Sequence, residues 1–215
     1  MTITDLVEDD IYTMAHYWNG QKREFIEAPT EAFAQIVRPS VYFEEDPDPL
    51  LEGQVSATFS EWVLFDCRLD ERGTLLERYI SEQAAVVPRE RLGRLAQVAA
   101  THVFSEFAIA SKNPAAGTLE VVDIYDGMSR EVLDVRSARR DDWNHGTISM
   151  RIARVNGVWL PVGKTVMYDR CHFDPAWIPI EDEMGTSGGR LLMLAHAVFG
   201  VDGRYHGSLS LRALE

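Results

Sequence analysis

Residues 147–167 decide the fold of the second half of this chain, and they read TISMRIARVNGVWLPVGKTVM. Apolar and polar side chains alternate through residues 147–155, which is the period of a β-strand. Asn156 and Gly157 both accept a positive φ, so this pair favours a two-residue hairpin turn. We therefore predict a hairpin in which residues 158–167 form the partner strand.

The apolar positions of the two strands do not match each other. If Val155 pairs with Val158, then Arg151 lies opposite Val162, and the apolar side chains do not all fall on one face. A β-bulge would resolve this mismatch, and so would a barrel in which both faces of the strands are partly covered. We favour the small barrel.

Further β-type segments lie on both sides of the hairpin. Short apolar runs and period-two alternation predict strands at residues 104–109, 118–125, 131–135 and 208–214. Residues 191–199 are apolar enough for either a short helix or a buried strand. The second half is thus predicted to be strand-rich.

The first half shows helical spacing instead. Apolar residues recur on one face in residues 5–18, 30–37, 74–80 and 88–103. Thr74 and Glu77 match a capping box, and Pro88 suits the first turn of a helix. Residues 59–65 are too apolar for an exposed element. Residues 44–49, with two prolines and four acids, are predicted to form a solvated loop.

These patterns predict an α+β fold, with a helical N-terminal half packed on an antiparallel small β-barrel-like sheet. We divide the chain into a mainly helical, acidic region at residues 1–103 and a strand-rich, barrel-like region at residues 104–215. The sequence leaves open whether the two regions form one domain or two.

The charge is strongly acidic and unevenly distributed. The 215 residues carry a formal net charge of −13. Residues 1–58 hold twelve acidic and three basic residues, whereas residues 129–165 hold seven basic and four acidic ones. Phosphate backbones repel an acidic protein, so nucleic acid is a disfavoured partner, although the basic segment could form a local exception.

The sequence predicts a cytoplasmic protein. The first ten residues are acidic, unlike a signal peptide, and no apolar run approaches the roughly 18–20 residues of a membrane helix, so we expect no membrane association. Cys67 and Cys171 are far apart in the sequence, and we predict that both are reduced thiols.

Three short segments contain reactive residue types without a catalytic motif. Residues 171–174 combine Cys171, His172 and a carboxylate, but neighbours on a strand point to opposite faces. Residues 141–146 combine two carboxylates with His145, and a turn is the favoured interpretation. The glycine-rich residues 185–190 lack the Gly-Lys-Ser/Thr ending of a phosphate-binding loop. We predict no catalytic residues, metal site or cofactor, and we leave open whether the protein is an enzyme.

One basic set is a candidate binding surface. It comprises Arg136, Arg139, Arg140, Arg151, Arg154 and Trp159. Arginines beside an aromatic face can hold phosphates or stack on bases. In the alternative, which we favour, these arginines pair with Asp134, Asp141 or Asp142, or with the acidic N-terminal half.

A family resemblance rests on residues 59–66, which read FSEWVLFD, and on Leu69, residues 73–76 and Tyr79. This segment resembles one in uncharacterised bacterial proteins, some of which carry a SecA-type C-terminal zinc motif. A strand-rich portion follows in those proteins, similar to residues 118–163 here, including Gly146 and Gly163. This chain lacks the Cys-x-Cys cluster, so a zinc-dependent role does not carry over. The resemblance implies a bacterial cytosolic protein and supplies no activity.

Two functions remain. We expect a non-enzymatic interaction or regulatory module that binds a protein or nucleic-acid partner through the strand-rich half. The alternative is a hydrolase or transferase that uses His145 or His172 with nearby carboxylates. The sequence gives no oligomeric state.

Overall fold

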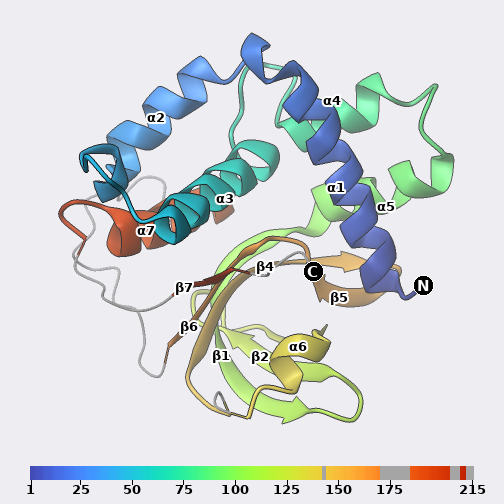
Figure 1. Cartoon of the computed structure of the whole chain (residues 1–215). Coiled ribbons are helices and arrows are strands. Elements are labelled where there is room, and N and C mark those ends of the chain that lie inside the picture. Colours follow the sequence, from blue (N-terminus) through green and yellow to red (C-terminus); the bar gives the residue numbers. More distant parts are fainter. Residues whose placement is uncertain (142–143, 170–184, 204–208, 212–215) are drawn as a thin grey trace.

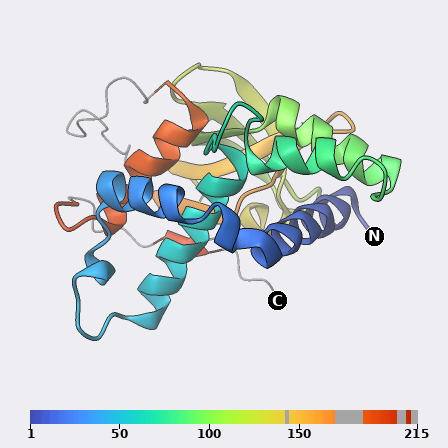
Figure 2. The same ribbon diagram turned by 90° about the horizontal axis from the view of Figure 1, so that it is seen from above.

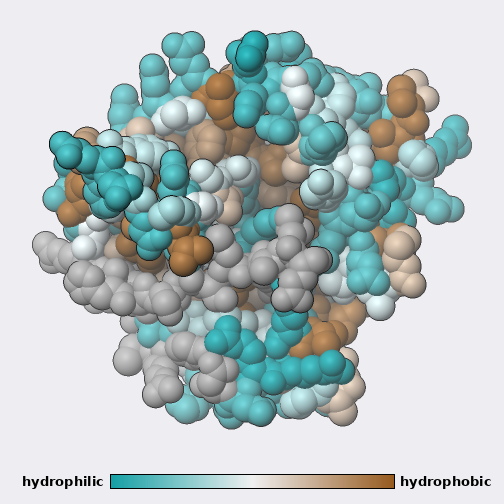
Figure 3. All heavy atoms as spheres, in the orientation of Figure 1, coloured by the Kyte–Doolittle hydropathy of each residue, from teal (hydrophilic) through white to brown (hydrophobic). Residues whose placement is uncertain are grey.

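A layer of helices lies over a β-barrel in this protein (Figures 1 and 2). The structure is a computed structural model, and it describes residues 1–141, 144–169, 185–203 and 209–211. Hydrophilic side chains cover most of the face seen in Figure 3, and apolar side chains line part of a hollow between α1 and α3. None of the described helices has the length and apolar character needed to cross a membrane.

The N-terminal half is helical, as predicted. Its helices are α1 (Ile3–Gln21), α2 (Glu27–Val37), α3 (Pro49–Phe65), α4 (Leu75–Glu82) and α5 (Arg89–Thr101). Thr74 and Glu77 form the predicted capping box at α4. Helix α3 begins at Pro49, earlier than the apolar residues 59–65 suggest, because the Asp48 side chain caps it and proline suits its first turn.

The strand-rich half closes into a small barrel, which confirms the predicted fold class. Its strands are β1 (Val103–Asn113), β2 (Thr118–Asp123), β3 (Ser129–Leu133), β4 (Thr147–Val155) and β5 (Val158–Pro161). They follow the order β1-β2-β3-β5-β4, and pairing of β1 with β4 closes the barrel. The β3–β5 pair is parallel, so the barrel is mixed rather than wholly antiparallel.

The predicted hairpin joins β4 and β5. Val155 pairs with Val158, and the turn between them has φ of 50° at Asn156 and 84° at Gly157. The prediction of one continuous partner strand is wrong, because β5 ends at Pro161 and a separate strand, β6 (Thr165–Asp169), pairs with the first part of β4. Strand β7 (Leu209–Leu211) then pairs with β6.

Both faces of β4 are covered, and this coverage explains the mismatch in the hairpin. Ile148, Met150 and Ile152 lie in the barrel interior. Ala153 and Val155 belong instead to a second core between the barrel and the helices. That core contains residues of both halves of the chain, including Phe33 and Phe65 from the first half.

Two more helices lie in the strand-rich half. Helix α6 (Val135–Ala138) follows β3, and helix α7 (Ser187–Phe199) packs on α2, α3 and β1. Residues 191–199, for which the sequence allowed either a short helix or a buried strand, are therefore helical. The glycine-rich residues 185–190 lead into this helix, and the Thr186 side chain caps it by accepting a hydrogen bond from Gly189 N.

Candidate binding cleft

A fully buried arginine joins the barrel to the helices. Arg151 projects from β4, and its side chain is 0% exposed. Its Nε donates to Glu61 Oε1 at 2.9 Å, and its two terminal nitrogens donate to the two oxygens of Asp66. Glu61 lies in α3, and Asp66 is the residue that ends this helix. Two carboxylates of the helical layer therefore hold one cation of the barrel.

Two further side chains complete this cluster, which we call the Arg151 centre: Arg151, Glu61, Asp66, His102 and Ser187. One terminal nitrogen of Arg151 lies 3.0 Å from His102 Nδ1 and 2.9 Å from Ser187 Oγ. Ser187 Oγ also accepts a hydrogen bond from Phe104 N at 2.7 Å. A buried guanidinium needs hydrogen-bond partners, and the centre supplies at least one for each of its three nitrogens, from α3, the α5–β1 connection and α7.

The Glu61 carboxylate also binds the connection between β5 and β6. Its Oε2 accepts hydrogen bonds from Lys164 N and Thr165 N, each at 2.8 Å. Gly163 leaves room for this contact, because a Cβ atom there would lie 2.6 Å from Glu61 Cδ. Glu61 and Asp66 both come from the FSEWVLFD segment, so this segment supplies both carboxylates that hold Arg151.

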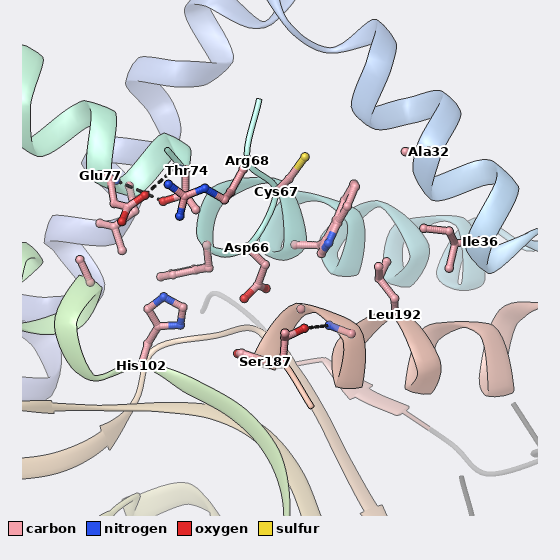
Figure 4. Close-up of a pocket in the computed structure, with 17 residues that line it drawn as sticks. Ala32, Ile36, Asp66, Cys67, Arg68, Thr74, Glu77, His102, Ser187 and Leu192 are labelled. Atoms are coloured by element: carbon pink, nitrogen blue, oxygen red, sulfur yellow. Dashed lines mark hydrogen bonds between the residues drawn. The ribbon is translucent and has the colours of Figure 1, made fainter. Parts of the chain in front are cut away.

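A cleft of about 580 Å³ opens beside the centre (Figure 4). Its apolar lining includes Ala32, Ile36, Trp62, Phe65, Leu76, Ala99 and Leu192, and its polar lining includes Asp66, Cys67, Arg68, Thr74, Glu77, His102 and Ser187. Asp66, His102 and Ser187 lie around one space between α3, β1 and α7, whereas Cys67 points away from it toward α2. The cleft is thus formed where the two halves of the chain meet.

The reactive side chains of the cleft are held in unreactive states. Burial, together with the charge of Arg151, lowers the pKa of His102 to about 3, so the imidazole is neutral at pH 7. Its Nδ1 accepts from Arg151, which leaves the proton on Nε2 as a donor. Burial, together with Asp66, raises the pKa of Cys67 to about 11, which keeps the thiol protonated.

These states favour binding over nucleophilic catalysis. A general base needs a free lone pair, but the lone pair of His102 Nδ1 faces Arg151. A serine nucleophile needs a base, but Ser187 Oγ is bonded to Arg151 and Phe104 N. The cleft offers a ligand apolar surface and the donors of His102 and Arg68, beside the carboxylates of Asp66 and Glu77.

The structure separates Arg151 from the rest of the predicted basic set. Arg136 and Arg139 are exposed at α6, and Arg154 is exposed on β4. Arg140 is half-buried, with its guanidinium 4.7 Å from the ring centre of Tyr168. For Arg151, the alternative that it pairs with the acidic N-terminal half is confirmed by its bonds to Glu61 and Asp66.

Trp159 lies directly opposite Arg154 in the β4–β5 hairpin and is half-buried. The guanidinium over its ring, at 5.4 Å, belongs to Arg130, which the prediction did not include. Arg130 also pairs with the buried Asp123 and with Asp126. This aromatic face is therefore occupied from within the protein.

The other predicted segments fall in turns or outside the described residues. His145 is exposed, and Asn144 Nδ2 donates to Asp141 O in the turn that the sequence favoured. Cys171 and His172 lie outside the described ranges. Among residues 1–141, 144–169, 185–203 and 209–211, no group of three or more His, Cys, Asp or Glu side chains is arranged to hold a metal.

Sequence reasoning missed Glu61, Asp66 and His102 as partners of Arg151. One feature of the sequence did indicate that Arg151 is buried. The predicted hairpin places it opposite Val162, in a strand that we expected to be covered on both faces. A buried arginine requires buried counter-charges, and Glu61 and Asp66 are the two acids of the mainly apolar FSEWVLFD segment.

Comparison of the chain with protein-family models, with curated proteins and with solved structures found no match.

Proposed function

We propose that this protein is a non-enzymatic binding module and that the cleft receives a segment of a protein partner. The observation that carries the proposal is an open cleft of about 580 Å³ whose reactive groups are engaged by the scaffold. Apolar pockets with a few fixed polar groups are typical of binding sites, and such sites occur preferentially where structural units meet. Helix α7, which belongs to the strand-rich half, lines one side of this cleft.

The lining indicates which segment would fit. Ala32, Ile36 and Leu192 lie toward one end of the cleft, and His102 and Arg68 lie toward the other (Figure 4). The first end offers apolar surface, and the second offers the Nε2–H and guanidinium donors. An extended segment with an apolar side chain next to backbone carbonyl oxygens would complement both ends, because carbonyl oxygens carry no charge to be repelled by Asp66 and Glu77. The net charge of −13 favours protein over nucleic acid as the partner.

The alternative is a hydrolase or transferase that uses His145 or His172 with nearby carboxylates. His145 is exposed on a turn rather than set in the cleft, and Asp141 is exposed as well. An active site usually places such groups in a concave pocket, which gives the binding proposal more support.

Photo-crosslinking from the cleft tests the proposal. A photoreactive phenylalanine analogue at Ala32 should capture one protein in cells of the source organism, and mass spectrometry would identify it. The same residue at Gln35, which is exposed on α2 and does not line the cleft, is the matched control.

The captured protein would then be purified and titrated against three forms of this chain. Ala32→Trp should fill the cleft and weaken binding at least tenfold, whereas Gln35→Trp should leave the affinity of the wild type unchanged. Equal affinity for all three forms, or equal capture from both positions, would show that the cleft is not the binding site.

A further inference from the structure

A second cavity lies on the other side of α3, and neither the sequence nor the proposed function assigns it a role. It occupies about 390 Å³ between α1, α3 and the β5–β6 connection, and we call it the α1–α3 groove. Residues 8, 11, 12 and 15 of α1 line one side, and residues 57, 60, 61 and 64 of α3 line another. Both sets have the spacing of a single helical face, so two helices present one face each to the same space.

The groove is apolar over most of its lining. Ile11 and Leu64 are half-exposed in it, and Pro161 and Val162 form part of its floor. Ala15 and Ala57 are too small to fill the space between the helices. A volume of about 390 Å³ falls within the roughly 300–1,000 Å³ of small-molecule sites, so a compact apolar body would fit.

A lysine gives the groove its charge preference. Lys164 is half-buried in the groove lining, and burial lowers its pKa, which means that its ammonium has lost part of its hydration. The charge of Glu8 acts in the opposite direction and raises the pKa of Lys164. Among the described residues, however, the Lys164 ammonium and the Glu8 carboxylate form no ion pair. Arg136 also lines the groove.

The other carboxylate of the lining does not compensate Lys164. Glu61 Oε1 accepts from Arg151, and Glu61 Oε2 accepts from two backbone N–H groups. Its charge is therefore engaged by the Arg151 centre. An anionic group next to Lys164 would replace the lost hydration of the ammonium.

We propose that the α1–α3 groove binds a small apolar carboxylic acid, with its hydrocarbon part between α1 and α3 and its carboxylate on the Lys164 ammonium. The volume of the groove suits a small molecule. Its apolar lining suits a hydrocarbon chain, and the Lys164 ammonium suits an anionic group at one end of that chain. The site is separate from the cleft, so this inference does not depend on the proposed protein partner.

Calorimetric titration with decanoate tests the inference. The wild type should bind decanoate saturably at one site, and Lys164→Gln should weaken binding at least tenfold. Decanol and decylamine should bind the wild type at least tenfold more weakly than decanoate does. Ala57→Trp, which fills the groove from α3, should abolish binding.

Three controls keep the test specific. Lys22→Gln removes an exposed lysine that lies outside the groove and should leave decanoate affinity unchanged, as should Ala32→Trp in the cleft. Thermal unfolding of each variant shows whether it is folded. Equal binding of decanoate by the wild type and Lys164→Gln, or no saturable binding, would overturn the inference. Binding of a peptide with an apolar C-terminal residue, but not of decanoate, would also overturn it in favour of a protein terminus.

Discussion

The two faces of β4 make contact with their neighbours by different physical means. On the barrel side, β4 contributes Ile148, Met150 and Ile152 to the apolar core. On the face toward the helices, Ser149 and Arg151 are buried as well, and Arg151 relies on two carboxylates from α3. Apolar contacts tolerate many partners, whereas a buried ion pair tolerates few. We therefore infer that the ion pairs of Arg151 act together with the apolar contacts of Ala153 and Val155 to fix how the helices are placed on the barrel.

The largest effect should follow from removing the buried cation. Arg151→Met leaves Glu61 and Asp66 buried without a counter-charge, and such a loss destabilises a protein by about 3–5 kcal/mol. Urea unfolding followed by circular dichroism measures the free energy of unfolding. Arg154→Met, at an exposed position of the same strand, is the matched control and should change it by less than about 0.5 kcal/mol. If both substitutions lowered the free energy of unfolding by the same amount, the buried ion pairs of Arg151 would not stabilise the protein more than an exposed arginine does.

Gly163→Ala tests the helix-facing side without changing a charge. The added methyl group would lie 2.6 Å from Glu61 Cδ, and the carboxylate cannot move without losing its bonds to Arg151 and to two backbone N–H groups. We expect a loss of about 1–3 kcal/mol in the free energy of unfolding. Gly157 is no suitable control because of its positive φ, but Gly20→Ala is, since no atom lies within 4 Å of a Cβ there. A neutral Gly163→Ala would mean that Glu61 is free to move.

The pH dependence of stability should report His102. Its pKa is about 3 in the folded protein and about 6.5 in the unfolded chain, so between these values the unfolded chain binds more protons. Stability is therefore lost as the pH falls through 6.5, by about 1–1.5 kcal/mol between pH 7.5 and 5.5. His102→Gln keeps an acceptor for Arg151 but does not titrate. Urea titrations at both pH values should show this loss in the wild type and a smaller one in the variant, and identical losses would contradict a neutral, buried His102.

The smallest effect is expected inside the barrel. Met150→Leu conserves side-chain volume on the apolar face and should cost less than about 1.5 kcal/mol by the same urea assay. This substitution is the interior counterpart of Arg151→Met, one residue away on the opposite face. A cost as large as that of Arg151→Met would show that the interior is packed as specifically as the ion pair.

The local parts of this fold were predictable from the sequence, and the contacts between distant segments were not. Period-two alternation and Asn156-Gly157 are sufficient to predict the β4–β5 hairpin, and Thr74 with Glu77 is sufficient to predict the start of α4. The partners of Arg151 lie 90 and 85 residues away, where no local pattern reports them. The basic set therefore included Arg151 by sequence proximity, although its side chain belongs to the interior.

The candidate site was harder to predict than the fold for the same reason. The cleft draws Ile36, Asp66, His102 and Ser187 from four separate elements, and no sequence pattern indicates that these elements meet. The glycine-rich residues 185–190 were noted for their resemblance to a phosphate loop. Their position at the start of α7 instead gives close packing, because a Cβ on Gly188 would lie 2.7 Å from Asp66 Cβ.

A double-mutant cycle on Arg151 and Asp66 tests whether this buried ion pair holds the helices to the barrel. The free energy of unfolding is measured for the wild type, Arg151→Met, Asp66→Asn and the double variant. We predict a coupling free energy of about 2–3 kcal/mol, because each single variant leaves one buried group without its partner. Effects that add to within about 0.5 kcal/mol would show that the two side chains do not interact, and that this ion pair does not hold the helices to the barrel.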